Sequence, residues 1–267
     1  MKTADPRQLL DGSLEAREEN LRRLTSRAQD GDEPAKEILR AVARDYHDYH
    51  RTIYSRAMNY AASFGDASLE GPLLAALADR PYNCQAWAAM GCTALGFRSA
   101  VPGMLVLLDS EQWMARKEAA IGLGELGDDT VVPALAPLLS DPADWMREAA
   151  AEALAKIGTD AALAALWDAF DHRRFQRIGY LSSALAEFTP EVLPRLLAAA
   201  GSDDPDTRYW AAVALGSTGD DRAVETLERL MADDRGSTVF DGWVSVAAKK
   251  GLRTLRRIQA AIAARES

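Results

Sequence analysis

Three histidines and two cysteines are the residues of this chain best suited to bind a metal ion or attack a substrate. His47 and His50 lie one helical turn apart in the doubled tripeptide DYHDYH, a spacing at which two imidazoles can share a Zn²⁺ ion. A zinc site needs further ligands, and the sequence supplies none at a matching spacing. We therefore expect no metal site and interpret this segment as the start of a surface helix.

The two cysteines, Cys84 and Cys92, belong to a single helical pattern. Their separation corresponds to about 12 Å along a helix, which is too far for a disulfide. In the repeat described below they occupy the core positions of Ala115 and Leu123, so we expect small core residues and not nucleophiles. A phosphate-binding glycine loop, a G-x-S-x-G motif and a C-x-x-C motif are absent. The sequence therefore predicts no catalytic residue and no cofactor.

The composition limits the kinds of partner that the chain is expected to bind. The net charge is −9 over 267 residues and the pI is about 5.0, which argues against broad contact with nucleic acid. No apolar run approaches the roughly 20 residues of a membrane helix, and the first residues lack the apolar stretch of a signal peptide. We expect a cytoplasmic protein that binds neither nucleic acid nor membrane. Residues 241–267 differ, with six basic and two acidic side chains.

An internal repeat dominates the rest of the sequence. Glycines that end an apolar helical pattern recur with a spacing of 31 residues and, across one gap, 61 residues; they are Gly65, Gly96, Gly127, Gly158 and Gly219. The neighbouring units ARKEAAIGLGELGDDTVVPALAPLLSD and MREAAAEALAKIGTDAALAALWDAFD align without a gap. About six units fit this frame, and self-similarity at such a period is typical of solenoid proteins.

Each unit has the features of a helical hairpin. Apolar residues recur along one face of the first helix, and the glycine is expected to end that helix in a left-handed conformation. We expect Asp109, Asp141 and Asp204 to cap the first helices, while acidic pairs such as Asp128–Asp129 open the second. No segment alternates with a period of two residues. The predicted fold class is all-α.

The pattern D-x-x-(V)-R-x-x-A-A-x-x-L-x-x-(L/I)-G, followed by V-x-x-L-x-x-L-L, resembles the short HEAT-like repeats of phycobilisome lyases over roughly residues 34 to 255. The resemblance implies a right-handed α-solenoid whose R-x-x-A-A helices line the concave surface. We expect one continuous domain: a polar capping helix within 1–33, about six repeats in 34–232, and an irregular loop with a basic capping helix in 233–267.

A stripe of large side chains is the candidate binding site. If Ala115, Ala119 and Leu123 face the core, the positions opposite them face outward. Across the repeats these positions hold four aromatic residues, two methionines and two glutamates: Trp87, Met90, Met114, Glu118, Trp145, Glu152, Tyr180 and Trp210. Aromatic and methionine side chains are typical anchors in protein-binding grooves. The alternative is that Trp87 or Trp210 fills space between repeats. For Arg116, Arg147 and Arg208 we expect a structural ladder of bonds to turn aspartates.

These features favour a non-enzymatic scaffold that binds a peptide or protein segment in its concave groove. Two alternatives remain open, a lyase-like or small-ligand-handling accessory protein and a bacterial immunity protein whose acidic body neutralises a basic toxin. A fold of this kind does not by itself specify an activity. The sequence does not identify the partner or the oligomeric state.

Overall fold

The computed structural model describes residues 11–45, 49–79, 84–172, 179–238 and 241–266, and these residues form fifteen α-helices joined by short turns and 3₁₀ segments. Within this part of the chain there is no strand, although Ser237 and Trp243 form an isolated β-bridge. The predicted all-α class is confirmed. The chain divides into two compact units, residues 1–127 and 128–267, and the sequence-based boundaries near residues 33 and 232 fall inside these units.

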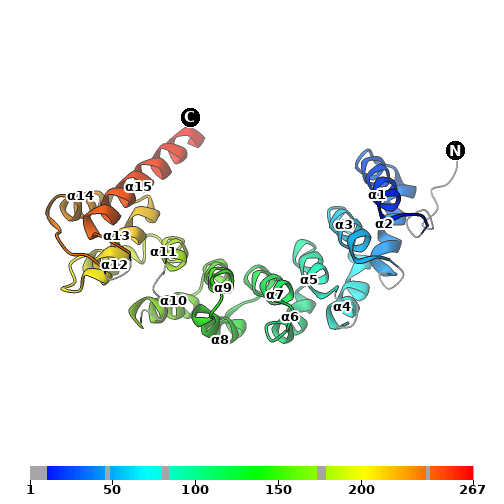
Figure 1. Cartoon of the computed structure of the whole chain (residues 1–267), viewed down its shortest axis with the longest axis horizontal. Coiled ribbons are helices and arrows are strands. Elements are labelled where there is room, and N and C mark those ends of the chain that lie inside the picture. The colour runs from blue at the N-terminus through cyan, green and yellow to red at the C-terminus, as the bar shows by residue number, and fades with distance from the viewer. Residues whose placement is uncertain (1–10, 46–48, 80–83, 173–178, 239–240, 267) are drawn as a thin grey trace. The chain divides into compact units, whose positions relative to one another are not determined.

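Unit 1 is built from two rows of helices. Its α-helices are α1 (Leu14–Gln29), α2 (Glu33–Arg44), α3 (Arg51–Ala62), α4 (Glu70–Ala78), α5 (Gln85–Ala94), α6 (Val101–Leu107) and α7 (Trp113–Leu126). Helices α3, α5 and α7 pack side by side in one row, and α2, α4 and α6 pack in the other (Figure 1). Successive hairpins therefore bury their apolar faces against one another, as the repeat predicts.

Unit 2 is also built from packed helical hairpins. Its α-helices are α8 (Val132–Leu135), α9 (Asp144–Ile157), α10 (Asp160–His172), α11 (Gly179–Ala186), α12 (Leu193–Ala199), α13 (Pro205–Thr218), α14 (Val224–Asp233) and α15 (Val244–Glu266). Helices α9, α11, α13 and α15 form one row in which each helix packs against the next. Helix α1 begins after its cap Ser13, and α15 covers the basic C-terminal segment.

The glycines and aspartates of the turns follow the expected chemistry only in part. Gly65, Gly96, Gly158 and Gly219 have φ values between 66° and 73°, the left-handed conformation that ends a helix at low cost for glycine. Gly127 does not, because the chain leaves α7 extended (φ −81°, ψ −174°) before Asp128 caps the next 3₁₀ turn.

The expected aspartate caps are correct at one of three helices. The Asp204 side chain accepts a hydrogen bond from the backbone N–H of Thr207 (2.8 Å) and caps α13. Asp141 instead accepts from the N–H of Ala143 (2.8 Å), the residue before α9. At α7 the residue before the helix is Gln112, whose N–H donates to the Ser110 hydroxyl (3.2 Å). Before α7 and α9, the Ser110 and Asp141 side chains therefore bond to the turn that precedes the helix and do not cap the helix itself.

The three repeat arginines have a structural role, and their shared acceptors are backbone carbonyls. Arg116, Arg147 and Arg208 each donate to the carbonyl oxygen six residues earlier, at distances of 2.6, 2.7 and 2.8 Å. Arg147 also bonds to the Asp144 carboxylate, and Arg208 to that of Asp234. The arginines thus satisfy carbonyl groups of the turn that precedes each helix.

Arg147 offers a direct test of this role. Only 7% of its surface is exposed, and it bonds to the carbonyls of Asp141 and Pro142. We expect Arg147→Met to lower the free energy of unfolding by about 1–3 kcal/mol, because the substitution keeps an apolar stem but removes the donor to two carbonyl groups of a part-buried turn. Arg222→Ala, at an ion pair whose arginine side chain is 59% exposed, should leave the free energy of unfolding nearly unchanged. Urea denaturation of both variants measures the difference, and equal losses would contradict the assignment.

The Arg208–Asp234 pair makes stability depend on acid. The Asp234 carboxylate accepts from Nε and Nη2 of Arg208 (2.6 and 3.1 Å), and this bonding holds its pKa below the ordinary value of 3.8. A lowered carboxyl pKa contributes stability above the unfolded-state pKa and loses it as the pH falls through the folded-state pKa. We therefore expect unfolding free energy to decline below about pH 5.

The variant Asp234→Asn should be less stable at neutral pH and show a shallower decline in acid. Glu148→Gln, at an exposed position of α9, is the matched control for the loss of one negative charge. Urea titrations at a series of pH values compare the two, and an unchanged acid slope in Asp234→Asn would exclude this contribution.

Candidate partner-binding groove

A groove of about 570 Å³ lies on unit 1 where α3, α5 and α7 adjoin. Its lining contains an apolar set from α5 and α7 and a polar set from α3 and the turn before α7: Thr52, Ser55, Ala86, Trp87, Glu111, Gln112, Trp113 and Met114. The volume falls within the roughly 300–1,000 Å³ typical of ligand pockets. Three consecutive helices of one row therefore contribute side chains to a single concave feature.

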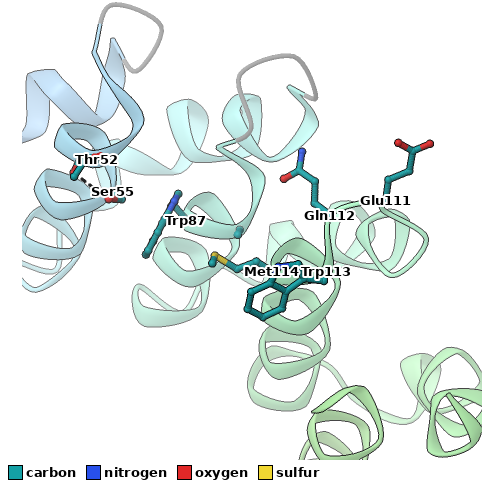
Figure 2. A pocket seen from close by; sticks show the side chains of 8 residues that line it. Thr52, Ser55, Trp87, Glu111, Gln112, Trp113 and Met114 are labelled. Atoms are coloured by element: carbon teal, nitrogen blue, oxygen red, sulfur yellow. Dashed lines mark hydrogen bonds between the residues drawn. The ribbon is translucent and has the colours of Figure 1, made fainter. Parts of the chain in front are cut away.

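The apolar side of the groove contains two residues of the predicted stripe. Trp87 and Met114 are both half-buried and come from neighbouring helices, α5 and α7 (Figure 2). The 31-residue repeat places their columns at the same surface, and in the structure both residues line this groove. Their exposed parts offer ring and thioether surface to a ligand.

The sequence analysis missed Trp113, which lines the groove next to Met114 (Figure 2). It is 53% exposed, a large exposed fraction for an aromatic residue. In the frame that aligns Met114 with Trp145, the equivalent positions hold Tyr82, Asp144, Phe175 and Pro205, so aromatic residues recur in this column. Its position at the start of α7, beside the predicted stripe, is the signal that could have found it.

Polar residues line the groove on both sides of Trp87 (Figure 2). Thr52 and Ser55 lie on α3, where the Ser55 hydroxyl donates to the Thr52 carbonyl (3.0 Å), as Figure 2 shows. Glu111 and Gln112 project from the turn before α7. An apolar floor beside polar groups is the usual composition of a specific binding site.

Two further predicted residues of unit 1, Met90 and Glu118, lie one turn along their helices from the groove and do not belong to its lining. Both are half-buried. Burial raises the pKa of the Glu118 carboxyl, with Lys117 acting in the opposite direction. A carboxylate in this setting has lost part of its hydration, which favours pairing with a cation.

The predicted residues of unit 2 have diverse environments. Trp145 is half-buried and Glu152 is exposed. Tyr180 is already engaged, because its hydroxyl donates to the Leu139 carbonyl (3.3 Å) and the Arg147 guanidinium lies 5.9 Å from the centre of its ring. Burial also raises the pKa of Tyr180. These contacts tie α11 to α9 and to the 3₁₀ segment Ala136–Ser140 before it, so Tyr180 has a structural role.

The expected outward position of Trp210 is wrong. Only 9% of this residue is exposed. Its ring lies near α11, where a Cβ atom added to Gly179 would stand 3.9 Å from Cζ3, and it meets the Tyr209 ring edge-on at 5.0 Å. Trp210 therefore fills space between α11 and α13, the packing alternative considered for it. That the stripe residues of both units form one binding surface stays a prediction.

The cysteines have the environment of core residues. Both are buried, and no disulfide joins them. Burial raises the pKa of Cys84 to about 11 and that of Cys92 to about 12. At neutral pH both thiols are protonated, so neither presents the thiolate that nucleophilic attack requires.

The structure describes only one of the two histidines of the DYHDYH segment. His47 lies outside the described residues, whereas the His50 ring accepts a hydrogen bond from the backbone N–H of Thr52 (3.3 Å) at the start of α3. Among the described residues no group of three or more His, Cys, Asp or Glu side chains is arranged to hold a metal ion. In the same part of the chain, no helix combines the length and apolarity needed to cross a membrane.

Stacked helical hairpins with a groove across three helices define an α-helical repeat protein. A family model for HEAT repeats matches residues 70–145, 106–179 and 180–241, which together cover more than half of the chain. The chain therefore belongs to the HEAT-repeat family. A search of curated proteins found no match.

The chain is also similar to solved structures of three different kinds. Chains align from a complex of CpcE and CpcF of phycocyanin lyase from Nostoc sp. PCC7120 (22% identity, 82% of this chain and 94% of that one, TM-score 0.48), and from an engineered protein (20%, 94% and 77%, TM-score 0.52). Kap95p, solved with RanGDP, aligns over 96% of this chain and 41% of its own, at 14% identity and a TM-score of 0.52. At such identities the likeness concerns the fold.

Proposed function

We propose that this protein is a protein–protein interaction module and that its unit 1 groove binds an apolar side chain from a peptide segment of its partner. The observation that carries the proposal is the combination of Trp87, Trp113 and Met114 in one groove of about 570 Å³. Trp113 exposes more than half of its surface. The side chain of a partner would cover that surface and release its hydration water.

The polar residues of the groove lining support binding of a peptide. Thr52, Ser55 and Gln112 carry hydroxyl and amide groups, which can bond to the backbone of a bound segment. Such groups provide orientation while an apolar anchor provides most of the affinity. The half-buried Glu118 carboxyl, about one helical turn from the anchor, would favour a basic residue of the partner that replaces its lost hydration.

The finer alternatives rest on the sequence alone. A toxin-neutralising role draws on the acidic composition, and a lyase-like or ligand-handling role draws on the resemblance between repeats. The protonated state of the buried cysteines weighs against chemistry at a thiolate. These alternatives and the cytoplasmic location stay predictions.

A peptide-display selection tests the proposal without knowledge of the natural partner. We expect random peptides selected on the intact protein to carry an aromatic or large aliphatic residue. The double variant Trp87→Ala/Met114→Ala should bind a selected peptide at least about 30-fold more weakly, since truncating two anchors removes about 2 kcal/mol or more of binding free energy. Fluorescence anisotropy with a labelled peptide measures the dissociation constant.

The matched control is Val106→Ala, which truncates a residue of unit 1 that is 62% exposed and lies outside the groove lining. It should leave affinity unchanged, and circular dichroism must show that all variants remain folded. Peptides that bind the double variant as tightly as the unmodified protein would place the site elsewhere. A selection without enrichment of apolar anchors would also refute the proposal.

A further inference from the structure

The outward face of α15 carries a row of basic side chains. Lys249, Lys250, Arg253 and Arg257 are all exposed, and their spacings of three and four residues put them on one side of the helix. The opposite side is buried against α13 and α14 through residues such as Leu252 and Leu255. A long cationic strip therefore remains at the surface of an otherwise acidic chain.

Intramolecular interactions do not account for this strip. Among the described residues the four cations have no ion pair or hydrogen bond to an acidic group, whereas their neighbour Arg256 pairs with Glu228 at 3.2 Å. They also lie in the middle of α15, away from the last turn in which a helix dipole favours cations. Like charges three and four residues apart destabilise a helix. Repulsion within the row therefore lowers the stability of the folded chain, and a bound anionic partner would relieve it.

Exposed apolar surface adjoins the row at its N-terminal end. Trp243 is 55% exposed and Val246 is 46% exposed, and their spacing from Lys250 and Arg253 continues the same face of the helix. Aromatic and aliphatic surface next to cations is typical of a protein interface. Small counterions from solution could neutralise the basic row, but they would leave this apolar surface exposed to water.

We propose that the face of α15 formed by Trp243, Val246, Lys250, Arg253 and Arg257, with Lys249 at its edge, binds a short acidic segment of a partner protein that ends in apolar residues. The carboxylates of the segment pair with the basic row, and its apolar end covers Trp243 and Val246. The face shares no residue with the groove of unit 1. It does not depend on the function proposed for that groove.

The size and surroundings of the row favour an acidic protein segment over nucleic acid. From Lys249 to Arg257 the row extends about 12 Å along the helix axis, enough for a few carboxylates. The adjoining helix α14 exposes Glu225 and Glu228, and the whole chain carries a net charge of −9. A longer polyanion would meet these negative charges and be repelled.

Two labelled peptides, ten glutamates followed by two leucines and the same ten glutamates alone, test the proposal on the full-length protein. We expect the first peptide to bind more tightly, and both to weaken as salt increases. Lys250→Gln/Arg253→Gln should weaken binding of either peptide at least 10-fold. Trp243→Ala should abolish the preference for the leucines, and Arg265→Gln, at the end of α15 and outside the row, should change neither property.

Three outcomes would overturn the proposal. Unchanged peptide binding in Lys250→Gln/Arg253→Gln would exclude this face. Tighter binding of a 12-nucleotide oligothymidine or of phosphatidylserine vesicles, lost in the same variant, would assign the face to nucleic acid or to membrane. Salt-sensitive self-association in sedimentation, abolished by the variant, would assign it to a second copy of the chain. The groove variant Trp87→Ala/Met114→Ala should bind the acidic peptides normally, which separates this test from that of the proposed function.

Discussion

Gly216→Ala is expected to lower the free energy of unfolding by about 2–3 kcal/mol, although alanine favours a helix over glycine. A Cβ atom at Gly216 would lie 2.3 Å from the Cα of Gly251 and 2.7 Å from its carbonyl oxygen. Backbone atoms cannot rotate away as the tip of a side chain can. Helices α13 and α15 must therefore separate, and the contacts of Leu215 and Leu252, both buried, are weakened along with them.

The measurement is urea denaturation followed by circular dichroism, together with hydrogen exchange of the α15 amides. We expect exchange to accelerate in α15 most of all, because this helix packs against α13 along much of its length. Gly71→Ala is the matched control, because Gly71 lies within α4 and a Cβ atom there meets nothing within 4 Å. It should change stability by less than about 1 kcal/mol, because the helix propensity of alanine is offset by the contact of its Cβ with the following residue, Pro72. Equal losses in both variants would contradict the close approach of α13 and α15.

Trp210→Ala is expected to cost about 3–5 kcal/mol of folding free energy, the range for truncating a buried aromatic residue to alanine. The indole is 9% exposed and packs between α11 and α13, so its removal leaves a cavity lined by helices that cannot fully collapse. Loss of partner binding in this variant would reflect loss of folded structure.

Trp113→Ala supplies the comparison for Trp210. Because 53% of Trp113 is exposed, its truncation should change stability by less than about 1 kcal/mol while weakening binding at the groove. Thermal and urea unfolding of the two variants provide the test. If Trp210→Ala were as stable as Trp113→Ala, the buried position of Trp210 would be wrong.

The sequence by itself determined the repeat and the class of fold. Regular glycines, apolar stripes and the polar capping helix from residue 14 are local features, because helix periodicity and helix termination depend on a few neighbouring residues. The basic row of α15 was also visible as composition. Even here local rules had limits, since Gly127 leaves its helix extended where four other glycines are left-handed.

Only the tertiary structure decided which stripe residues are accessible. Trp87 and Trp210 occupy the same column of the repeat, yet Trp87 lines a groove while Trp210 is buried against α11. A column specifies the direction of a side chain about its own helix axis. It does not specify how closely the next helix approaches, which depends on the volumes of the side chains between them. For the same reason the repeat predicted Met114 in the groove but not Trp113, whose exposure follows from the way the start of α7 meets its neighbours.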